Sequence, residues 1–138
     1  MSDTRIEKTI FINSTPENVW LYLTDKEKLG EWFHPTNVNL SAGKDYQLLG
    51  DSGDKICWGR VVEAQAPSRL VYTFTHGHLD GVETTVIWEL SPVHDGTLLK
   101  LTHEGLANDA VSDPLGMLIS HDKGWDDHFG RLREKAAS

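Results

Sequence analysis

Cysteine and long apolar runs are both scarce in this sequence. The single cysteine in 138 residues, Cys57, can form no disulfide within the chain, so a reducing compartment is expected. No run approaches the ~18 apolar residues of a membrane-spanning helix. The first ten residues, MSDTRIEKTI, lack the apolar stretch of a secretory signal. These absences predict a cytoplasmic protein that does not insert into a membrane.

Basic charge is also in short supply. Lys and Arg number 13 against 21 Asp and Glu, which gives a net charge of −8. Nucleic acids and anionic membrane surfaces are bound by concentrated basic faces, so neither is an expected partner. The acidic balance favours a neutral or cationic ligand.

Tryptophan, by contrast, is abundant, with five in the chain. Trp buries a large ring while its N–H seeks an acceptor, so it concentrates in cores and ligand pockets. The chain length matches one domain, which we expect to cover residues 1–138. Hydrophobic residues make up 38%, enough for a packed core.

Alternating apolar and polar residues predict an antiparallel sheet. Residues 5–12 are expected to form a first strand. Ser14 and Glu17 have capping-box spacing and begin a short helix, and Asp25 caps a second one. Six further strands separated by turn signals are expected over 38–40, 46–49, 56–66, 69–75, 82–90 and 97–104.

The stretch from Ser112 to Lys135 predicts one long amphipathic helix with Asp113 as N-cap. Its apolar arc of about 100° contains Leu115, Leu118, Trp125, Phe129 and Leu132. Asp122 falls inside this arc, and His121 and His128 lie on its margin. A curved sheet closed over one long helix is an α+β architecture that leaves a cavity, so we expect a ligand site between sheet and helix.

Polar residues facing that interior are open to two interpretations. His103 shares a strand face with Leu99 and Leu101, so it should point inward together with His121 and Asp122 of the helix. These groups could orient a ligand or act as general acid and base. They could equally hydrogen-bond one another, or Trp N–H groups, and fix the helix on the sheet.

Motifs of nucleophilic, metal and cofactor chemistry are missing from the sequence. Cys57 has no activating base nearby, so an inert buried thiol is expected. None of the seven histidines has recognised zinc spacing, and no phosphate-binding Gly loop is present. We therefore assign no catalytic residue, metal or cofactor, and leave enzymatic activity as an alternative.

Four motifs in order resemble those of a known superfamily. They are Trp32-Phe33-His34-Pro35, then Gly59-x-Val61-x-Glu63 with Pro67-x-Arg69-Leu70-Val71-Tyr72, then Gly96-Thr97 continuing to Thr102-His103-Glu104-Gly105, and finally His121-x-x-Gly124-Trp125. Over residues 5–135 the chain resembles the START-like, or SRPBCC, helix-grip superfamily. Within it, the chain is most similar to homologues of the C-terminal domain of the heat-shock-protein-90 ATPase activator.

The resemblance implies a seven-stranded antiparallel sheet gripping the C-terminal helix around a hydrophobic cavity. Relatives include lipid carriers, polyketide cyclases and co-chaperone domains, so the fold alone does not fix one function. The leading hypothesis is a soluble protein that binds a small hydrophobic, lipid-like or polyketide-like molecule. The alternatives are a stress-related module acting on a chaperone ATPase, and a cyclase or hydrolase. A homodimer is also consistent with the superfamily.

The expected ligand-binding residues are mainly aromatic. They are Trp32, Phe33, Trp58, Tyr72, Phe74, Trp88, His103, Leu118, His121, Asp122 and Trp125. Because alternate strand residues face opposite sides, the sequence does not say which strand face looks inward.

Overall fold

A computed structural model describes residues 5–33, 36–49, 55–76, 84–104 and 114–136, without the side chains of residues 5, 55, 56, 76, 114–122 and 124. The elements follow in the order β1 (Arg5–Ile12), α1 (Pro16–Thr24), α2 (Lys26–Trp32), β2 (Asp45–Leu49), β3 (Lys55–Gln65), β4 (Arg69–His76), β5 (Thr84–Val93), β6 (Gly96–Glu104) and α3 (Pro114–Ala136). None of the helices in these ranges has the length and apolar character needed to cross a membrane.

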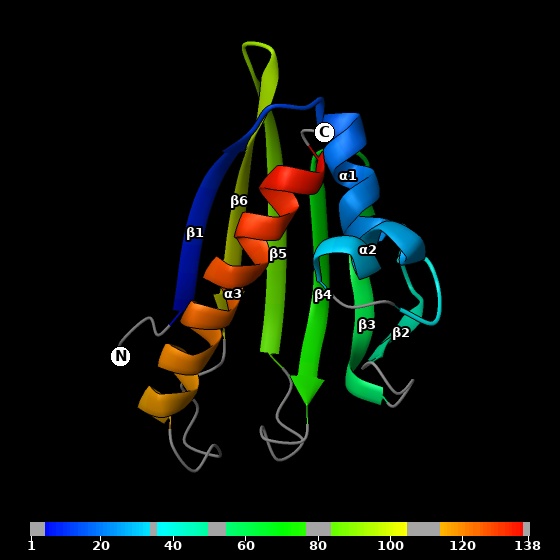
Figure 1. Ribbon diagram of the computed structural model, residues 1–138. Coiled ribbons are helices and arrows are strands. Elements are labelled where there is room, and N and C mark those ends of the chain that lie inside the picture. The colour runs from blue at the N-terminus through cyan, green and yellow to red at the C-terminus, as the bar shows by residue number, and fades with distance from the viewer. Residues whose placement is uncertain (1–4, 34–35, 50–54, 77–83, 105–113, 137–138) are drawn as a thin grey trace.

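The strands form one antiparallel sheet in the order β1-β6-β5-β4-β3-β2. All three helices lie on one face of it, with α3 running obliquely in front of β6 and β5 (Figure 1). We call this the helix-side face and the opposite one the outer face. Along β5 every second residue from Thr84 to Leu90 is buried, as expected for a strand with one face against the core.

The expected seventh strand over residues 38–40 is wrong, because the described part of the chain contains six strands. Thr36 forms an isolated bridge to Leu48 of β2, and the Asn37 N–H donates to the Gln47 carbonyl oxygen. The Leu40 N–H then donates to the Thr24 carbonyl oxygen at the end of α1, so its backbone bond goes to a helix. Residues 38–40 lead from the edge of the sheet to α1, so they do not form the successive backbone hydrogen bonds with β2 that a strand requires. The six-stranded α+β arrangement remains compatible with the helix-grip fold.

Both short helices begin close to their expected starts. The N-cap of α1 is Thr15, whose hydroxyl accepts from the Asn18 N–H at 3.1 Å, one residue later than the Ser14 cap that the sequence suggested. Pro16 therefore occupies the first helical position, where its missing N–H leaves no bond unmade. The Asp25 cap of α2 is confirmed, since its carboxylate accepts from the N–H groups of Glu27 and Lys28.

The second half of α3 is fastened to the rest of the fold. Its apolar stripe is confirmed for Trp125, Phe129 and Leu132, all buried. The last carbonyl groups of α3, at Lys135 and Ala136, accept hydrogen bonds from the Tyr22 and Asn18 side chains of α1. These bonds satisfy carbonyls that a helix end otherwise leaves open.

Candidate functional site

Aromatic side chains from both layers meet under α3. The sheet supplies Tyr72 and Phe74 from β4, Trp88 from β5 and His103 from β6, while the helical layer supplies Trp32, Phe33, Trp125, His128 and Phe129. We call these nine residues the aromatic cluster. Adjacent strands place their contributions on one face, because His103 pairs with Val86, and Val86 pairs with Tyr72.

The rings are in direct contact. Phe33 stacks on Trp32 with centroids 5.2 Å apart and on Trp125 with centroids 5.3 Å apart. Trp88 meets Trp125 edge-to-face at 5.5 Å, and its N–H donates to the Tyr72 hydroxyl at 3.0 Å. Such offset and edge contacts contribute beyond area burial, by about 0.5–1.5 kcal/mol a pair. The cluster therefore ties α3 to both α2 and the sheet.

A hydrogen-bond chain runs through the cluster from sheet to helix. The Thr84 hydroxyl donates to the Phe74 carbonyl oxygen at 2.7 Å, and Thr84 Oγ1 lies 2.7 Å from His103 Nε2. On the other side of the ring, the Trp125 indole N–H donates to His103 Nδ1 at 3.1 Å. We call this series the His103 chain. His103 is 0% exposed, so its two ring nitrogens are shielded from bulk solvent, and hydrogen bonds in such a setting are stronger than in water.

The His103 chain favours one of the two interpretations that the sequence left open. Both ring nitrogens are engaged by protein groups, one of them a Trp N–H. His103 therefore orients the helix on the sheet in this state. The side chains of His121 and Asp122, its expected partners in acid–base chemistry, lie outside the described residues.

The structure brings together seven of the expected ligand-binding residues. They are Trp32, Phe33, Tyr72, Phe74, Trp88, His103 and Trp125. Paired residues of neighbouring strands point to the same face of the sheet, and successive residues of one strand point to opposite faces. Cys57 pairs with His76, which shares the helix-side face with Phe74. Trp58 pairs with Thr75 and therefore lies on the outer face. The other three expected residues are Leu118, His121 and Asp122, whose side chains are not among those that the structure describes.

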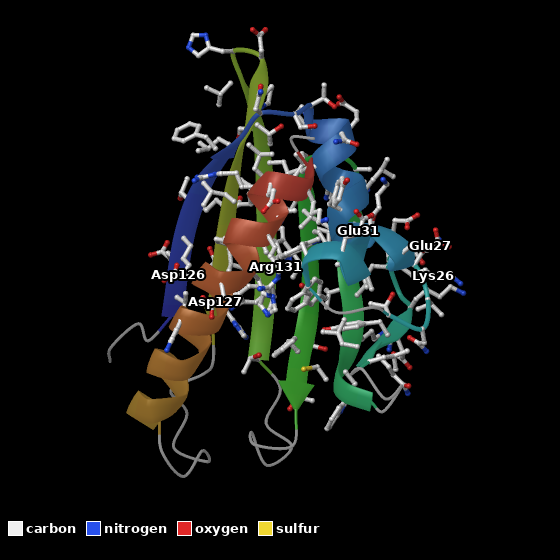
Figure 2. The ribbon with its side chains drawn as sticks, in the orientation of Figure 1. Lys26, Glu27, Glu31, Asp126, Asp127 and Arg131 are labelled. Carbon is white, nitrogen blue, oxygen red and sulfur yellow. The ribbon has the colours of Figure 1, made fainter. Side chains whose placement is uncertain are left out.

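Two residues of the site, Thr84 and Arg131, were not predicted from the sequence. Thr84 was assigned to a strand but to no site, although its alternation with Val86 and Trp88 would have placed it on their face. Arg131 on α3 is the other, and it reaches α2 (Figure 2). Its Nε–H donates to the Trp32 carbonyl oxygen at 3.1 Å, and Nη2 lies 2.6 Å from His128 Nδ1. A cation at the C-terminal end of α2 is favourably placed in the helix dipole.

The thiol of Cys57 is buried and free, as the sequence predicted. Burial raises the pKa of Cys57 to about 12, so the thiol is protonated at neutral pH. Burial also raises the pKa of the Tyr72 hydroxyl, even though its bond from Trp88 acts the other way. Cys57 is thus in its protonated, weakly nucleophilic form at neutral pH. No group of three or more His, Cys, Asp and Glu that could hold a metal is found among the residues described.

A surface hollow lies away from the aromatic cluster. Its volume is about 410 Å³, and it sits where the β5–β6 turn meets the end of β1. Phe11, Val93 and the residues from His94 to Thr97 line it, together with Ile12 and Asn13. None of the expected ligand-binding residues is among them.

The antiparallel sheet with a long C-terminal helix packed on it defines an α+β domain compatible with the helix-grip fold. A family model described as Activator of Hsp90 ATPase homolog 1-like protein matches residues 13–137. The chain belongs to this family, as the sequence motifs indicated.

Solved structures with the same fold include three informative relatives. DynU16, from the dynemicin biosynthetic locus, has a TM-score of 0.82 at 20% identity, over 96% of this chain and 47% of that one. An HSP90 activator from Plasmodium falciparum has 0.77 at 24%, over 93% and 92%. The Aha1 dimer from Colwellia psychrerythraea has 0.80 at 15%, over 97% and 96%. At these identities the likeness shows the fold alone. Comparison with curated proteins gives no match.

Proposed function

We propose that this chain binds a small, largely apolar molecule between α3 and the helix-side face of the sheet, next to His103. The observation that carries the proposal is the aromatic cluster, in which rings from helix and sheet surround one buried polar residue. Ligand sites have this composition, with apolar walls and a few placed polar groups. The relation of DynU16 to a natural-product locus is consistent with it.

Apolar burial would supply the affinity. A ligand that buries about 300 Å² of apolar surface gains roughly 7.5 kcal/mol at ~25 cal/mol per Å², before ordering losses are subtracted. The polar group at His103 adds orientation and a smaller increment. Because a dissociation constant of 1 μM corresponds to about 8.2 kcal/mol, subtracting the ordering losses places the expected dissociation constants in the high-micromolar range or above.

Titration with fatty acids, sterols and polycyclic aromatic polyketides tests this proposal. We expect at least one class to form a one-to-one complex in native mass spectrometry and to change tryptophan fluorescence. Trp125→Phe should reduce that change, because Trp125 borders the site together with Trp32 and Trp88. The matched control is Trp58→Phe on the outer face, which should retain it. A complete lack of complexes across the panel, or equal loss in both variants, would refute the proposal.

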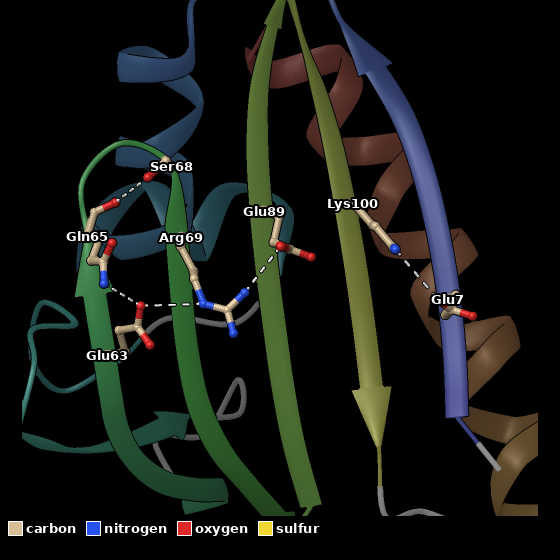
Figure 3. Close-up of polar contacts among 7 residues, drawn as sticks. All are labelled: Glu7, Glu63, Gln65, Ser68, Arg69, Glu89 and Lys100. Atoms are coloured by element: carbon tan, nitrogen blue, oxygen red, sulfur yellow. Dashed lines mark hydrogen bonds and ion pairs between the residues drawn. The ribbon is translucent and has the colours of Figure 1, made fainter. Parts of the chain in front are cut away.

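Action on a chaperone ATPase is a second candidate, supported by the family and by the Plasmodium falciparum relative. The outer face offers a surface for it, where charges alternate across five strands (Figure 3). There Arg69 lies 3.4 Å from Glu63 and 3.1 Å from Glu89, and Lys100 lies 3.6 Å from Glu7. Such a row can set the register of a charged partner. The Aha1 protein of Colwellia psychrerythraea is a dimer, which is consistent with a homodimer of this chain.

The rate of ATP hydrolysis by a purified Hsp90, measured with and without this chain, tests the second candidate function. The candidate requires a several-fold rise in the rate when the chain is added. Arg69→Glu should reduce that rise, because it reverses one of the two positive charges of the row, whereas Lys26→Glu on α2 should not. An unchanged hydrolysis rate in the presence of the parent chain would eliminate it.

A further inference from the structure

The direction of each bond in the His103 chain is fixed from the sheet side. A carbonyl oxygen only accepts, so the Thr84 hydroxyl must give its proton to Phe74. Thr84 Oγ1 is then left to accept, and it takes the proton on His103 Nε2. The ring therefore carries its proton on Nε2, and His103 Nδ1 is an acceptor. The Trp125 N–H, a donor only, confirms this orientation from the other side.

The hydrogen bonds on the two sides of His103 differ in the elements that they join. Phe74, Thr84 and His103 stand on three successive strands, β4, β5 and β6, whose ladders hold them in place. The bond to Trp125 is made across the layer boundary, to α3. Separation of helix from sheet at this point would break the bond at Nδ1 and leave the sheet-side bonds intact. Nδ1 is thus a preset acceptor that faces the helix.

We propose that His103 Nδ1 anchors the ligand, and that a bound molecule replaces the Trp125 N–H with an O–H or N–H of its own. This inference rests on the proposed function and names its ligand class. The ligand is an uncharged molecule with an apolar, roughly bicyclic body and one donor group, such as a phenol, an alcohol or a secondary amide. Its body would occupy the space of the Trp125 indole against Trp88 and Phe33.

The same geometry rejects an ionised carboxylate. A carboxylate has no proton to donate, so its oxygens would face the Nδ1 lone pair at a fully buried position. An apolar molecule without any donor would leave Nδ1 unpaired, which costs about 1–3 kcal/mol. Thr84 is the specificity-determining residue behind His103, since its hydroxyl sets which nitrogen carries the proton.

Three probes of one shape test the inference by calorimetric titration: 2-naphthol, naphthalene and 2-naphthoate. We expect 2-naphthol to bind about 10-fold more tightly than naphthalene, the factor that ~1.4 kcal/mol represents. Binding of 2-naphthoate should be the weakest. In 1H–15N spectra the Trp125 indole signal should move on addition of 2-naphthol, because that N–H loses its acceptor.

Variants at Thr84 separate an anchoring role from a merely structural one. Thr84→Val keeps the shape but removes the hydroxyl, and should bring the 2-naphthol preference close to one. Thr84→Ser restores the hydroxyl and should restore the preference. Equal affinity of the parent for 2-naphthol and naphthalene, or tightest binding of 2-naphthoate, would overturn the anchor while leaving the proposed function in place. If no probe and no molecule of the wider panel binds, both are overturned.

Discussion

Replacing Gly59 by alanine is expected to lower the free energy of unfolding by about 3 kcal/mol or more. A Cβ atom at Gly59 would lie 2.0 Å from the carbonyl oxygen of Thr73 and 2.7 Å from its carbonyl carbon. Both atoms belong to the backbone of the neighbouring strand β4, so no side-chain rotation relieves the contact. The same oxygen accepts the Tyr46 hydroxyl at 2.6 Å, and this bond would be disturbed as well.

Urea unfolding followed by circular dichroism measures the effect as a lower midpoint, by about 2 M for a slope near 1.5 kcal/mol per M. Gly130→Ala is the matched control. Gly130 is exposed within α3, and a Cβ there meets no atom within 4 Å. This change should stabilise the protein by about 0.5–1 kcal/mol, because alanine favours the helix. Parental stability of Gly59→Ala would contradict the close approach of β3 and β4.

Patterns local in sequence predicted most of the fold. Alternation located the six observed strands, and the period of the last segment located α3, since each depends on near neighbours along the chain. The three-residue segment 38–40 failed because its partner is decided by distant groups. Leu40 bonds to the end of α1, which no local pattern reveals.

The residue types of the candidate site could be predicted from the sequence, but its hydrogen-bond pattern could not. The structure gathers seven of the expected residues under α3. The face of Trp58, however, depends on its pairing with Thr75, and strand register is a non-local property. The link from Thr84 to His103 likewise spans a hairpin and needs the β5–β6 register. Residue types suggested a polar group under α3, whereas only the structure assigns donors and acceptors to it.

Trp88→Ala is expected to lower the free energy of unfolding by about 3–5 kcal/mol, the range for truncating a buried aromatic residue. Trp88 is 1% exposed and contacts Trp32, Trp125 and Phe129, so its removal opens a void beneath α3. Phe11→Ala is the control, since Phe11 is 63% exposed and should change stability by no more than about 0.5 kcal/mol. If thermal unfolding showed a loss for Trp88→Ala as small as the one expected for Phe11→Ala, Trp88 would not be part of the core.

The polar share of the Trp88 effect can be isolated by a double-mutant cycle with Tyr72. Tyr72→Phe removes the acceptor of the Trp88 N–H, which is then buried without this partner, and should cost about 1–3 kcal/mol. Trp88→Phe removes the donor, and the double variant removes both groups together. Because two buried polar groups then disappear as a pair, the double variant should be more stable than the sum of the single losses by about 1 kcal/mol. Strict additivity would mean that the 3.0 Å contact contributes nothing, and that apolar packing alone holds Trp88 beneath α3.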